Sequence, residues 1–236
     1  MDPGHIVKQR FLLTPEHPCS YLARDARTLF LDPREDHSPD TYAALSGVGF
    51  RRSGDHLYRP HCDDCRACVA TRVPVRQFRM TRRFRRVLAR NDDLAMRIEP
   101  ARYGDEAYAL YERYIIERHG EGDMYPPSPD QFRAFLLAEW SDTRFVNAYL
   151  GERLVAVAVT DVLASGLSAI YTFFDPSLAE RSLGVLSILR QIAVCQHAGL
   201  PYLYLGYWIE EADKMRYKTD YRPIELFGKQ GWMQHA

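Results

Sequence analysis

The stretch LSAIYTFFDPSLAERSLGVLSILRQIAVCQHAGLPYLYLGY, residues 167–207, decides the fold. Its two ends, 167–174 and 201–207, are short aliphatic and aromatic runs, which are typical of strands. Between them, residues 181–197 carry apolar side chains at helical spacing, and the expected inward face consists of Leu183, Leu186, Leu189, Ile192, Ala193 and Gln196. Strand, helix and strand in this order predict a right-handed crossover in a mixed sheet, so the C-terminal half is expected to be α/β or α+β.

The turn that opens this helix resembles a phosphate-binding turn. Arg181, Ser182 and Gly184 fit the first part of the pattern Gln/Arg-x-x-Gly-x-Gly/Ala of acetyltransferase-like folds, whereas Leu186 stands at its last position. Backbone N–H groups at a helix N-terminus are free to bind an anion or a developing oxyanion. The turn therefore predicts an acetyltransferase-like (GNAT-type) mixed sheet with flanking helices, without the usual acetyl-CoA chemistry.

Further elements are expected on the N-terminal side of this stretch. Strands are expected at 27–32, near 69–73, at 144–150 and at 153–163; a hairpin at 50–59; and helices after Ser38-Pro39, at 76–90, at 103–119 and from Ser128 to Trp140. These elements predict two units. Residues 1–93 form a smaller Cys- and Arg-rich α+β unit, and residues 94–236 form the acetyltransferase-like domain.

Composition narrows the class of protein. The chain has 236 residues, of which 46% are hydrophobic. It contains no apolar run long enough to cross a bilayer, and its first residues lack a signal-peptide pattern. We therefore expect a cytoplasmic protein, in which clustered cysteines indicate metal binding or catalysis before disulfides.

Four cysteines form a candidate metal site. Cys62, Cys65 and Cys68 follow one another at three-residue spacing, and Cys19 supplies a fourth thiol. Four thiolates are enough for a tetrahedral zinc site or an iron–sulfur cluster. His17 and His61 are alternative ligands. A set of free, redox-responsive thiols is the competing interpretation.

Arginines are concentrated in residues 51–90. This window holds twelve arginines, three aspartates and no lysine, a balance of +9, while the whole chain has 31 basic and 31 acidic residues. Such asymmetry favours a phosphate-binding face, most readily for RNA, over an ordinary solvated helix. The candidate RNA contacts in the predicted helix are Arg79, Arg82, Arg83, Arg85 and Arg86.

Two further features indicate a functional site in the C-terminal half. Asp161 lies in an otherwise apolar strand, so it needs either a buried arginine partner or a catalytic task, and both interpretations stay open. Residues 214–222 carry many donors, which favours recognition of a carboxylate or phosphate over a surface strand with packed tyrosines; these donors are Lys214, Tyr217, Lys218, Tyr221 and Arg222.

Taken in order, these motifs resemble the aminoacyl-tRNA–protein transferases of the N-degron pathway, and among them most the bacterial aspartate/glutamate leucyltransferases. The matching segments cover nearly the whole chain: CSYL (19–22), YRPHCDDCRACVATRVPV (58–75), YTFFDP (171–176), RSLGVLSILRQIA (181–193) and YLYLGYWIEEADKMRYKTDYRP (202–223). The related eukaryotic arginyltransferases are longer and have CGYC, where this chain has Leu22 in place of the second cysteine.

The resemblance implies a reaction and its partners. The α-amine of a protein that begins with Asp or Glu attacks the ester of leucyl-tRNA, the co-substrate, and the product is marked for degradation. The ester is already activated, so holding the two reactants in line should contribute more to the rate than the strength of a base that deprotonates the amine. No cofactor is required for the chemistry.

Site residues are expected on this basis. The catalytic candidates are Asp161, which would orient or deprotonate the amine, Tyr171 and Asp175. Substrate-binding candidates are Arg181, Ser182, Lys214, Tyr217, Lys218, Tyr221 and Arg222, of which the cations would contact the acidic side chain or the tRNA 3′ phosphates. The arginines from Arg79 to Arg86 would bind tRNA, and the cysteine set would support this unit with zinc or an iron–sulfur cluster.

Three alternatives remain. An arginyl donor would give an arginyl-tRNA–protein transferase. The same fold could serve an acetyl-CoA-dependent N-acetyltransferase, against which Leu186 and the arginine-rich window argue. A non-enzymatic, metal-containing RNA-binding protein would explain the cysteines and arginines, but it would leave Asp161 and residues 214–222 without a task.

Overall fold

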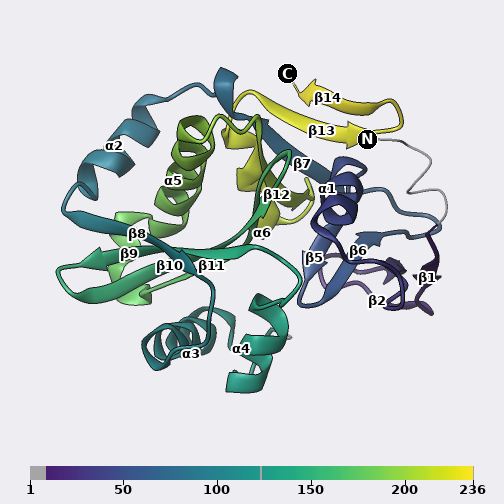
Figure 1. Cartoon of the computed structure of the whole chain (residues 1–236), viewed down its shortest axis with the longest axis horizontal. Coiled ribbons are helices and arrows are strands. Elements are labelled where there is room, and N and C mark those ends of the chain that lie inside the picture. Colours follow the sequence, from purple (N-terminus) through teal and green to yellow (C-terminus); the bar gives the residue numbers. More distant parts are fainter. Residues whose placement is uncertain (1–8, 123, 236) are drawn as a thin grey trace.

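The molecule is built on a large mixed sheet (Figure 1). The computed structural model describes residues 9–122 and 124–235. In spatial order the strands are β14 (Gly231–His235), β13 (Ile224–Gly228), β7 (Val69–Pro74), β12 (Tyr202–Trp208), β11 (Gly166–Phe174), β10 (Arg153–Leu163), β9 (Thr143–Leu150) and β8 (Leu94–Pro100). Strands β11 and β12 are parallel, and the other neighbouring pairs are antiparallel.

Strands β11 and β12 separate soon after they pair. Their register runs from Gly166 opposite Tyr202 only to Ser168 opposite Tyr204. A bulge between Tyr204 and Gly206 then carries β12 along β7, while β11 continues beside β10. We call the point beyond Ser168 and Tyr204 the sheet fork. Helix α5 (Leu183–His197) connects the two strands, which confirms the predicted strand–helix–strand unit.

Helices cover both faces of this sheet (Figure 1). Helices α5 and α2 (Arg82–Arg90) lie over one face, where Leu186, Leu189 and Phe84 enter the core. Helices α3 (Asp105–His119) and α4 (Pro129–Leu136) lie over the other, with Tyr111 and Phe132 buried beneath them. The mixed sheet with flanking helices agrees with the predicted fold class.

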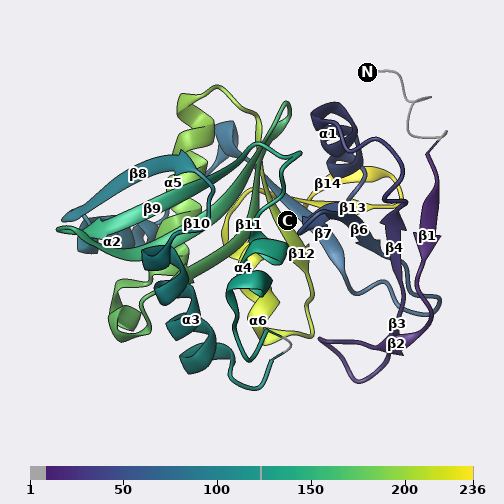
Figure 2. The same ribbon diagram turned by 60° about the horizontal axis from the view of Figure 1, so that its bottom comes forward.

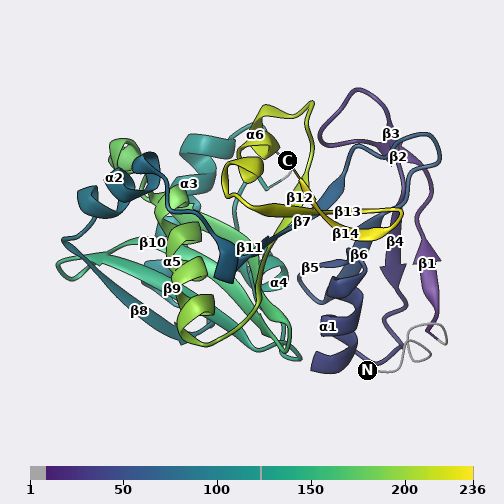
Figure 3. The same ribbon diagram turned by 90° about the horizontal axis from the view of Figure 1, so that it is seen from above.

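A smaller sheet stands beside the β12–β7 half of the large one (Figures 2 and 3). Its strands, in spatial order, are β1 (Phe11–Leu13), β4 (Thr28–Leu31), β6 (His56–Pro60) and β5 (Arg51–Ser53). Helix α1 (Pro39–Gly47) packs against it, and the Ser38 side chain accepts a hydrogen bond from the Thr41 N–H, as the sequence predicts. A short ribbon of β2 (His17–Pro18) and β3 (Asp25–Ala26) completes this part.

Several predicted helix limits are wrong. The helix expected at 76–90 begins only at Arg82, because the Thr81 side chain caps it by accepting from the Phe84 N–H, and Val75–Gln77 forms a separate 3₁₀ turn, η2. The helix expected to reach Trp140 ends at Leu136. Before α5 the chain forms the 3₁₀ helix η3 (Pro176–Arg181), and Ser182 adopts a left-handed φ of 55°.

The face of α5 also differs in part from the expectation. Ala193 and Gln196 are exposed, whereas Gln191 is fully buried. Residues 213–220 form two short turns, α6 (Asp213–Arg216) and η4 (Tyr217–Asp220), rather than a surface strand. Strands β8, β13 and β14 were not predicted.

The division at residues 93 and 94 stays a prediction. Strand β7 and helix α2 precede that point in sequence but belong to the large sheet and its core. Within the part of the chain that the structure describes, no helix is long and apolar enough to span a bilayer.

Candidate active site at the sheet fork

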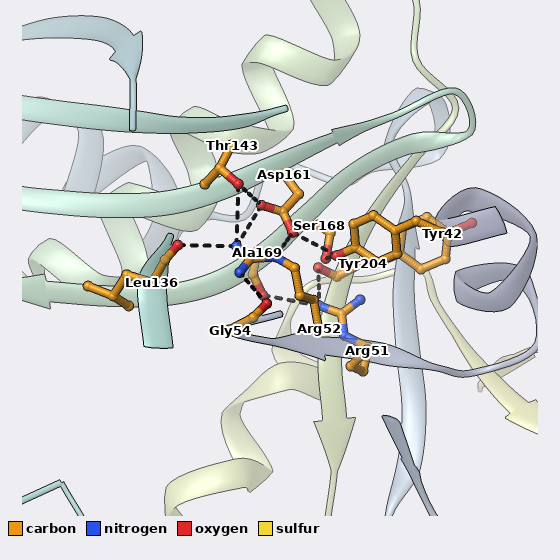
Figure 4. Close-up of polar contacts among 10 residues, drawn as sticks. All are labelled: Tyr42, Arg51, Arg52, Gly54, Leu136, Thr143, Asp161, Ser168, Ala169 and Tyr204. Carbon is orange, nitrogen blue, oxygen red and sulfur yellow. Dashed lines mark hydrogen bonds and ion pairs between the residues drawn. The ribbon is translucent and has the colours of Figure 1, made fainter. Parts of the chain in front are cut away.

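The sheet fork holds a buried arginine that comes from the small sheet. Arg51, on β5, is 5% exposed. Its Nη2 donates to the carbonyl oxygen of Ala169 on β11 at 3.1 Å and to that of Tyr204 on β12 at 3.4 Å. The guanidinium therefore bridges the two strands where they separate (Figure 4).

A buried lysine approaches the same point from the C-terminal segment. Lys218, in η4, is 5% exposed, and its Nζ donates to the Tyr207 carbonyl oxygen and to Met215 Sδ. A Cβ on Gly206 would lie 3.8 Å from Lys218 Nζ and 3.9 Å from Arg51 Nε. Gly206 has a φ of +80°, which favours glycine. The missing side chain leaves room for a small group beside both cations.

Neither cation has a carboxylate partner in residues 9–122 and 124–235, although the Cys68 thiol lies close enough to act on the pKa of Lys218. No carboxylate there lies within ion-pair distance of Arg51 or Lys218, and Nη1 of Arg51 is buried without a hydrogen-bond partner. Burial, and after it the charge of Arg51, lowers the pKa of Lys218 to about 7. Because buried charge is costly without compensation, the fork is suited to binding an anion.

A buried ion pair holds β5 in place beside this point (Figure 4). Arg52 and Asp161 both have fully buried side chains, and Nε and Nη2 of Arg52 donate to the two carboxylate oxygens at 2.6 and 2.8 Å. The hydroxyls of Tyr42 and Thr143 also donate to Asp161, each at 2.7 Å. Burial, and then the charge of Asp161, raises the pKa of the Tyr42 hydroxyl and keeps it a donor.

The remaining donors of Arg52 join further elements to β5. Nη1 donates to the Gly54 carbonyl oxygen at 3.0 Å, and Nη2 donates to that of Leu136, at the end of α4, at 3.3 Å. Asp161 thus has the buried arginine partner that one interpretation of the sequence required. These contacts favour a positioning role, and the catalytic role of Asp161 stays a prediction.

The other two catalytic candidates lie on or after β11. The Tyr171 hydroxyl is buried without a partner among the described residues, and burial raises its pKa. Asp175 is buried and caps η3: its Oδ1 accepts from the N–H and hydroxyl of Ser177 at 3.0 and 2.7 Å. Arg113 and Arg153 lie 3.3 and 3.2 Å from its Oδ2. Tyr171 is therefore available to a ligand, whereas Asp175 is engaged by its neighbours.

The substrate-binding candidates do not form one cluster. Arg181 makes a bidentate ion pair with Asp93 at 2.7 and 2.9 Å and thereby joins η3 to the end of α2. Ser182 provides no side-chain cap for α5. Of the C-terminal candidates, Tyr221 is buried and stacks on Phe84 at 5.1 Å. Lys214, Tyr217 and Arg222 are exposed.

The arginines predicted to bind RNA form an exposed surface along α2. We call Arg79, Arg82, Arg83, Arg85 and Arg86 the α2 surface; all five are exposed. Arg83 pairs with Asp220 of η4 at 2.5 Å, and Arg85 donates to the Met80 carbonyl oxygen at 2.8 Å. The ion pair connects this surface directly to the turn that carries Lys218.

The four predicted metal ligands lie close enough to influence one another. All four are free, half-buried thiols, and burial, followed by the charges of Cys19, Cys62 and Cys65, raises the pKa of Cys68 to about 12. Within the described ranges, however, no three Cys, His, Asp or Glu side chains have an arrangement that could hold a metal. The thiols therefore gather without forming ligand geometry, and no reaction step is derived through a metal or cluster.

Sequence reasoning missed Arg51 and the fork itself. Arg51 belongs to the basic window of residues 51–90, and its neighbours in sequence do not indicate that its side chain lies buried between β11 and β12. The amide of Gln191 on α5 is likewise buried with both polar atoms unpartnered among the described residues. The one available signal was the adjacent pair Arg51-Arg52 at a predicted strand, because one of two successive strand residues must face inward.

The fork, the connecting helix and the covered sheet define a mixed α/β protein with helices on both faces of the sheet. Two family models match the chain: "Arginine-tRNA-protein transferase, N terminus" over residues 17–86 and "Arginine-tRNA-protein transferase, C terminus" over residues 106–228. A solved C-terminal domain of a putative lysylphosphatidylglycerol synthetase from Agrobacterium fabrum matches 73% of this chain and 52% of its own, with 14% identity and a TM-score of 0.46.

Curated relatives match over almost the full length. A protein of Alcanivorax borkumensis is 56% identical over 96% of this chain and 94% of its own, and one of Pseudomonas aeruginosa is 53% identical over 97% of each. A protein of Hahella chejuensis is 51% identical over 94% of this chain and 96% of its own. All three are named aspartate/glutamate leucyltransferase. The chain belongs to the aspartate/glutamate leucyltransferases, within the arginine-tRNA–protein transferase family.

Proposed function

We propose that this protein transfers leucine from leucyl-tRNA to the α-amine of proteins that begin with Asp or Glu. The observation that carries the proposal is identity of 51–56% to proteins named aspartate/glutamate leucyltransferase over at least 94% of the chain. The cationic sheet fork supports it, because an enzyme that selects acidic N-termini needs a cationic site. The reaction takes place in the cytoplasm, and its product is marked for degradation.

The chemical step is an aminolysis of an ester. The amine nitrogen attacks the carbonyl carbon of the leucyl ester, a C–N bond forms, and the C–O bond to the tRNA 3′ ribose breaks. The amine loses a proton, and the ribose oxygen gains one. A terminal amine has a pKa of about 8, so about a tenth of it is unprotonated at pH 7. Forming the reactive, unprotonated amine therefore costs only ~1.4 kcal/mol.

Positioning contributes far more to such a reaction than base strength does. Holding two reactants in line supplies ~7–11 kcal/mol, which exceeds the protonation cost several-fold. The residues at the fork are suited to this task. Arg51 is fixed to two strands, and the Arg52–Asp161 pair fixes β5, so the acceptor would meet a rigid site. Tyr171 and the start of α5 would shape the ester site.

The α2 surface is the proposed contact for tRNA phosphates. Its arginines are exposed, and guanidinium groups bind phosphate with two parallel hydrogen bonds. The Arg83–Asp220 pair joins α2 to η4, which carries Lys218 at the fork. Leucyl-tRNA would therefore bind on one side of η4, and the N-terminus of the acceptor protein would bind on the other.

We propose the four thiols of Cys19, Cys62, Cys65 and Cys68 as ligands of zinc or an iron–sulfur cluster that supports the N-terminal part. The mutual influence of their charges supports this set. Because the four thiols do not have ligand geometry, the loop that carries Cys62, Cys65 and Cys68 would have to rearrange when it binds the metal or cluster. Metal analysis of the purified protein should find about one zinc or one cluster per chain, lost in Cys65→Ser; a metal-free active protein would contradict the proposal.

A transfer assay tests the proposed function. Purified protein receives leucyl-tRNA or arginyl-tRNA, each with a labelled amino acid, and peptides that begin with Asp, Glu or Ala. Labelled leucine is expected on the Asp and Glu peptides and not on the Ala peptide. Transfer of arginine would establish the arginyl alternative. An absence of any transfer would contradict an aminoacyl-tRNA-dependent function.

A further inference from the structure

Arg51 and Lys218 form a preformed anion site that the reaction chemistry alone does not require. The two side chains come from distant parts of the chain, β5 and η4, and meet at Gly206. Each is 5% exposed. A fixed guanidinium and a buried amine, neither paired with a carboxylate in the described part of the chain, lie side by side. A bound anion would stabilise the charged form of both, so their juxtaposition indicates a ligand.

The shape of this site favours a small terminal anion. Nη1 of Arg51 is buried without a partner in the described part of the chain, and the guanidinium is held by the Ala169 and Tyr204 carbonyl oxygens. A planar guanidinium with a free edge matches a carboxylate. An internal phosphate of a polynucleotide carries a sugar on both sides, which a site this buried cannot accept. The exposed α2 surface is better suited to such phosphates.

Its location favours a substrate group rather than a structural ion. Open α/β sheets bind ligands where neighbouring parallel strands separate, and β11 and β12 separate after Ser168 and Tyr204. Lys218 Nζ donates to the Tyr207 carbonyl oxygen. The bulge is fixed by the Thr71 hydroxyl, which donates to the Gly206 carbonyl oxygen at 3.1 Å. Both cations are therefore rigidly placed around the space at Gly206.

We propose that Arg51 and Lys218 bind the side-chain carboxylate of the N-terminal Asp or Glu of the acceptor protein and so determine acceptor specificity. This inference rests on the proposed function, because it takes the acceptor from it. The α-amine of the same residue then lies toward the open side of the fork, where the ester arrives. A neutral N-terminal residue offers no carboxylate to Arg51 and Lys218, so it binds more weakly than Asp or Glu.

The test compares peptides that begin with Asp or with the isosteric, neutral Asn, with leucyl-tRNA as donor. Arg51→Gln and Lys218→Met should each lower kcat/KM for the Asp peptide about 10–100-fold, mainly through KM, and should lower kcat/KM for the Asn peptide by a much smaller factor. The ratio of kcat/KM for the Asp peptide to kcat/KM for the Asn peptide (the Asp-to-Asn ratio) should therefore fall strongly. Lys218→Arg, which keeps the charge, should retain more of the ratio than Lys218→Met.

Exposed residues of the same types provide matched controls. Lys229→Met and Arg97→Gln remove one exposed cation each and should leave the ratio unchanged. Circular dichroism and thermal unfolding show whether each variant is folded. Calorimetric binding of the Asp peptide without tRNA is a second measurement, and it should weaken in the two fork variants by the same factor as KM rises.

Three outcomes would overturn the inference. An unchanged Asp-to-Asn ratio would show that other residues select the acceptor. An equal loss on both peptides would indicate a role in the chemical step. A raised KM for leucyl-tRNA with an unchanged peptide KM would indicate a phosphate ligand. If the unmodified protein transfers no leucine at all, the proposed function fails instead, and peptide binding still tests the fork.

Discussion

Arg51 and Arg52 are adjacent in sequence but have separate tasks. Successive side chains of a strand point to opposite sides, so β5 directs Arg51 to the sheet fork and Arg52 to Asp161 (Figure 4). The Arg52–Asp161 pair joins β5 to β10, and further contacts reach α1, β9 and α4. Asp161 would then act on the reaction through the position of Arg51 rather than through proton transfer.

Asp161→Asn tests this difference. The variant leaves the Arg52 guanidinium buried with reduced compensation, so the free energy of unfolding should fall by about 3–5 kcal/mol. Urea unfolding measures this loss. Any loss of activity should parallel the loss of folded protein, and the rate of the remaining folded enzyme should show the same pH dependence as the original protein.

The double variant Arg52→Met/Asp161→Leu completes the comparison. Replacement of both partners by apolar side chains should recover part of the stability that Asp161→Asn loses, since no charge is left unpaired. Transfer activity should recover with it. A folded double variant without activity would show that the carboxylate takes part in the chemistry, as the catalytic prediction holds.

At the scale of elements, η4 connects the two proposed substrate sites. Asp220 pairs with Arg83 of α2, Tyr221 stacks on Phe84, and Lys218, two residues earlier, reaches the fork. This turn is only four residues long, so a shift of α2 would be transmitted to Lys218. The proposed tRNA surface and the proposed acceptor site are therefore connected through this turn.

Replacement of α2 arginines should change the salt dependence of tRNA binding. Arg79, Arg82 and Arg86 have no ion-pair partner within the described part of the chain. Their joint replacement by Gln should reduce the slope of log affinity against log salt by about 2–3, because each phosphate contact contributes ~0.7–0.9. Filter binding of leucyl-tRNA at several salt concentrations measures the slope.

Two single variants accompany this measurement. Arg83→Gln should change the slope less than any of the three, because its charge is already compensated by Asp220. Arg97→Gln, on β8, should not change it. An unchanged slope in the triple variant would place the tRNA elsewhere on the molecule.

Most elements could be predicted from the sequence because their signals are local. The apolar period of α5, the cap at Ser38 and the turn at Gly151 each depend on a few neighbouring residues. The exact starts of α2 and α5 could not be predicted, because Thr81 and Ser182 decide them through single caps and backbone angles. Strands β13 and β14 have mixed sequences, and their place follows from long-range pairing: β13 pairs with β7, and β14 pairs with β13 at the edge of the sheet.

The site was less predictable than the fold because it depends on long-range pairing. Lys218 was expected among the substrate-binding residues, but its burial beside Arg51 follows from contacts across 167 positions of sequence. Asp161 was recognised as needing a partner, and Arg52 provides it from β5. Apart from the adjacent Arg52, nothing near Arg51 in the sequence distinguishes it from the exposed arginines of α2.

At the scale of the whole molecule, the small sheet completes the site of the large one. Arg51 reaches the fork only because β5 and α1 dock on β10 and β11 through Asp161 and Ser168. Neither sheet alone would present both Arg51 and Lys218. The proposed site thus combines residues from both halves of the chain, and family models match both halves.

A structure of the full-length protein bound to a peptide that begins with Asp tests the central claim most directly. We expect the aspartate carboxylate to lie about 3 Å from Nη1 of Arg51 and from Nζ of Lys218, with the α-amine toward the open side of the fork. A carboxylate bound instead by the exposed Lys214 or Arg222, with Nη1 of Arg51 still unpartnered, would contradict it.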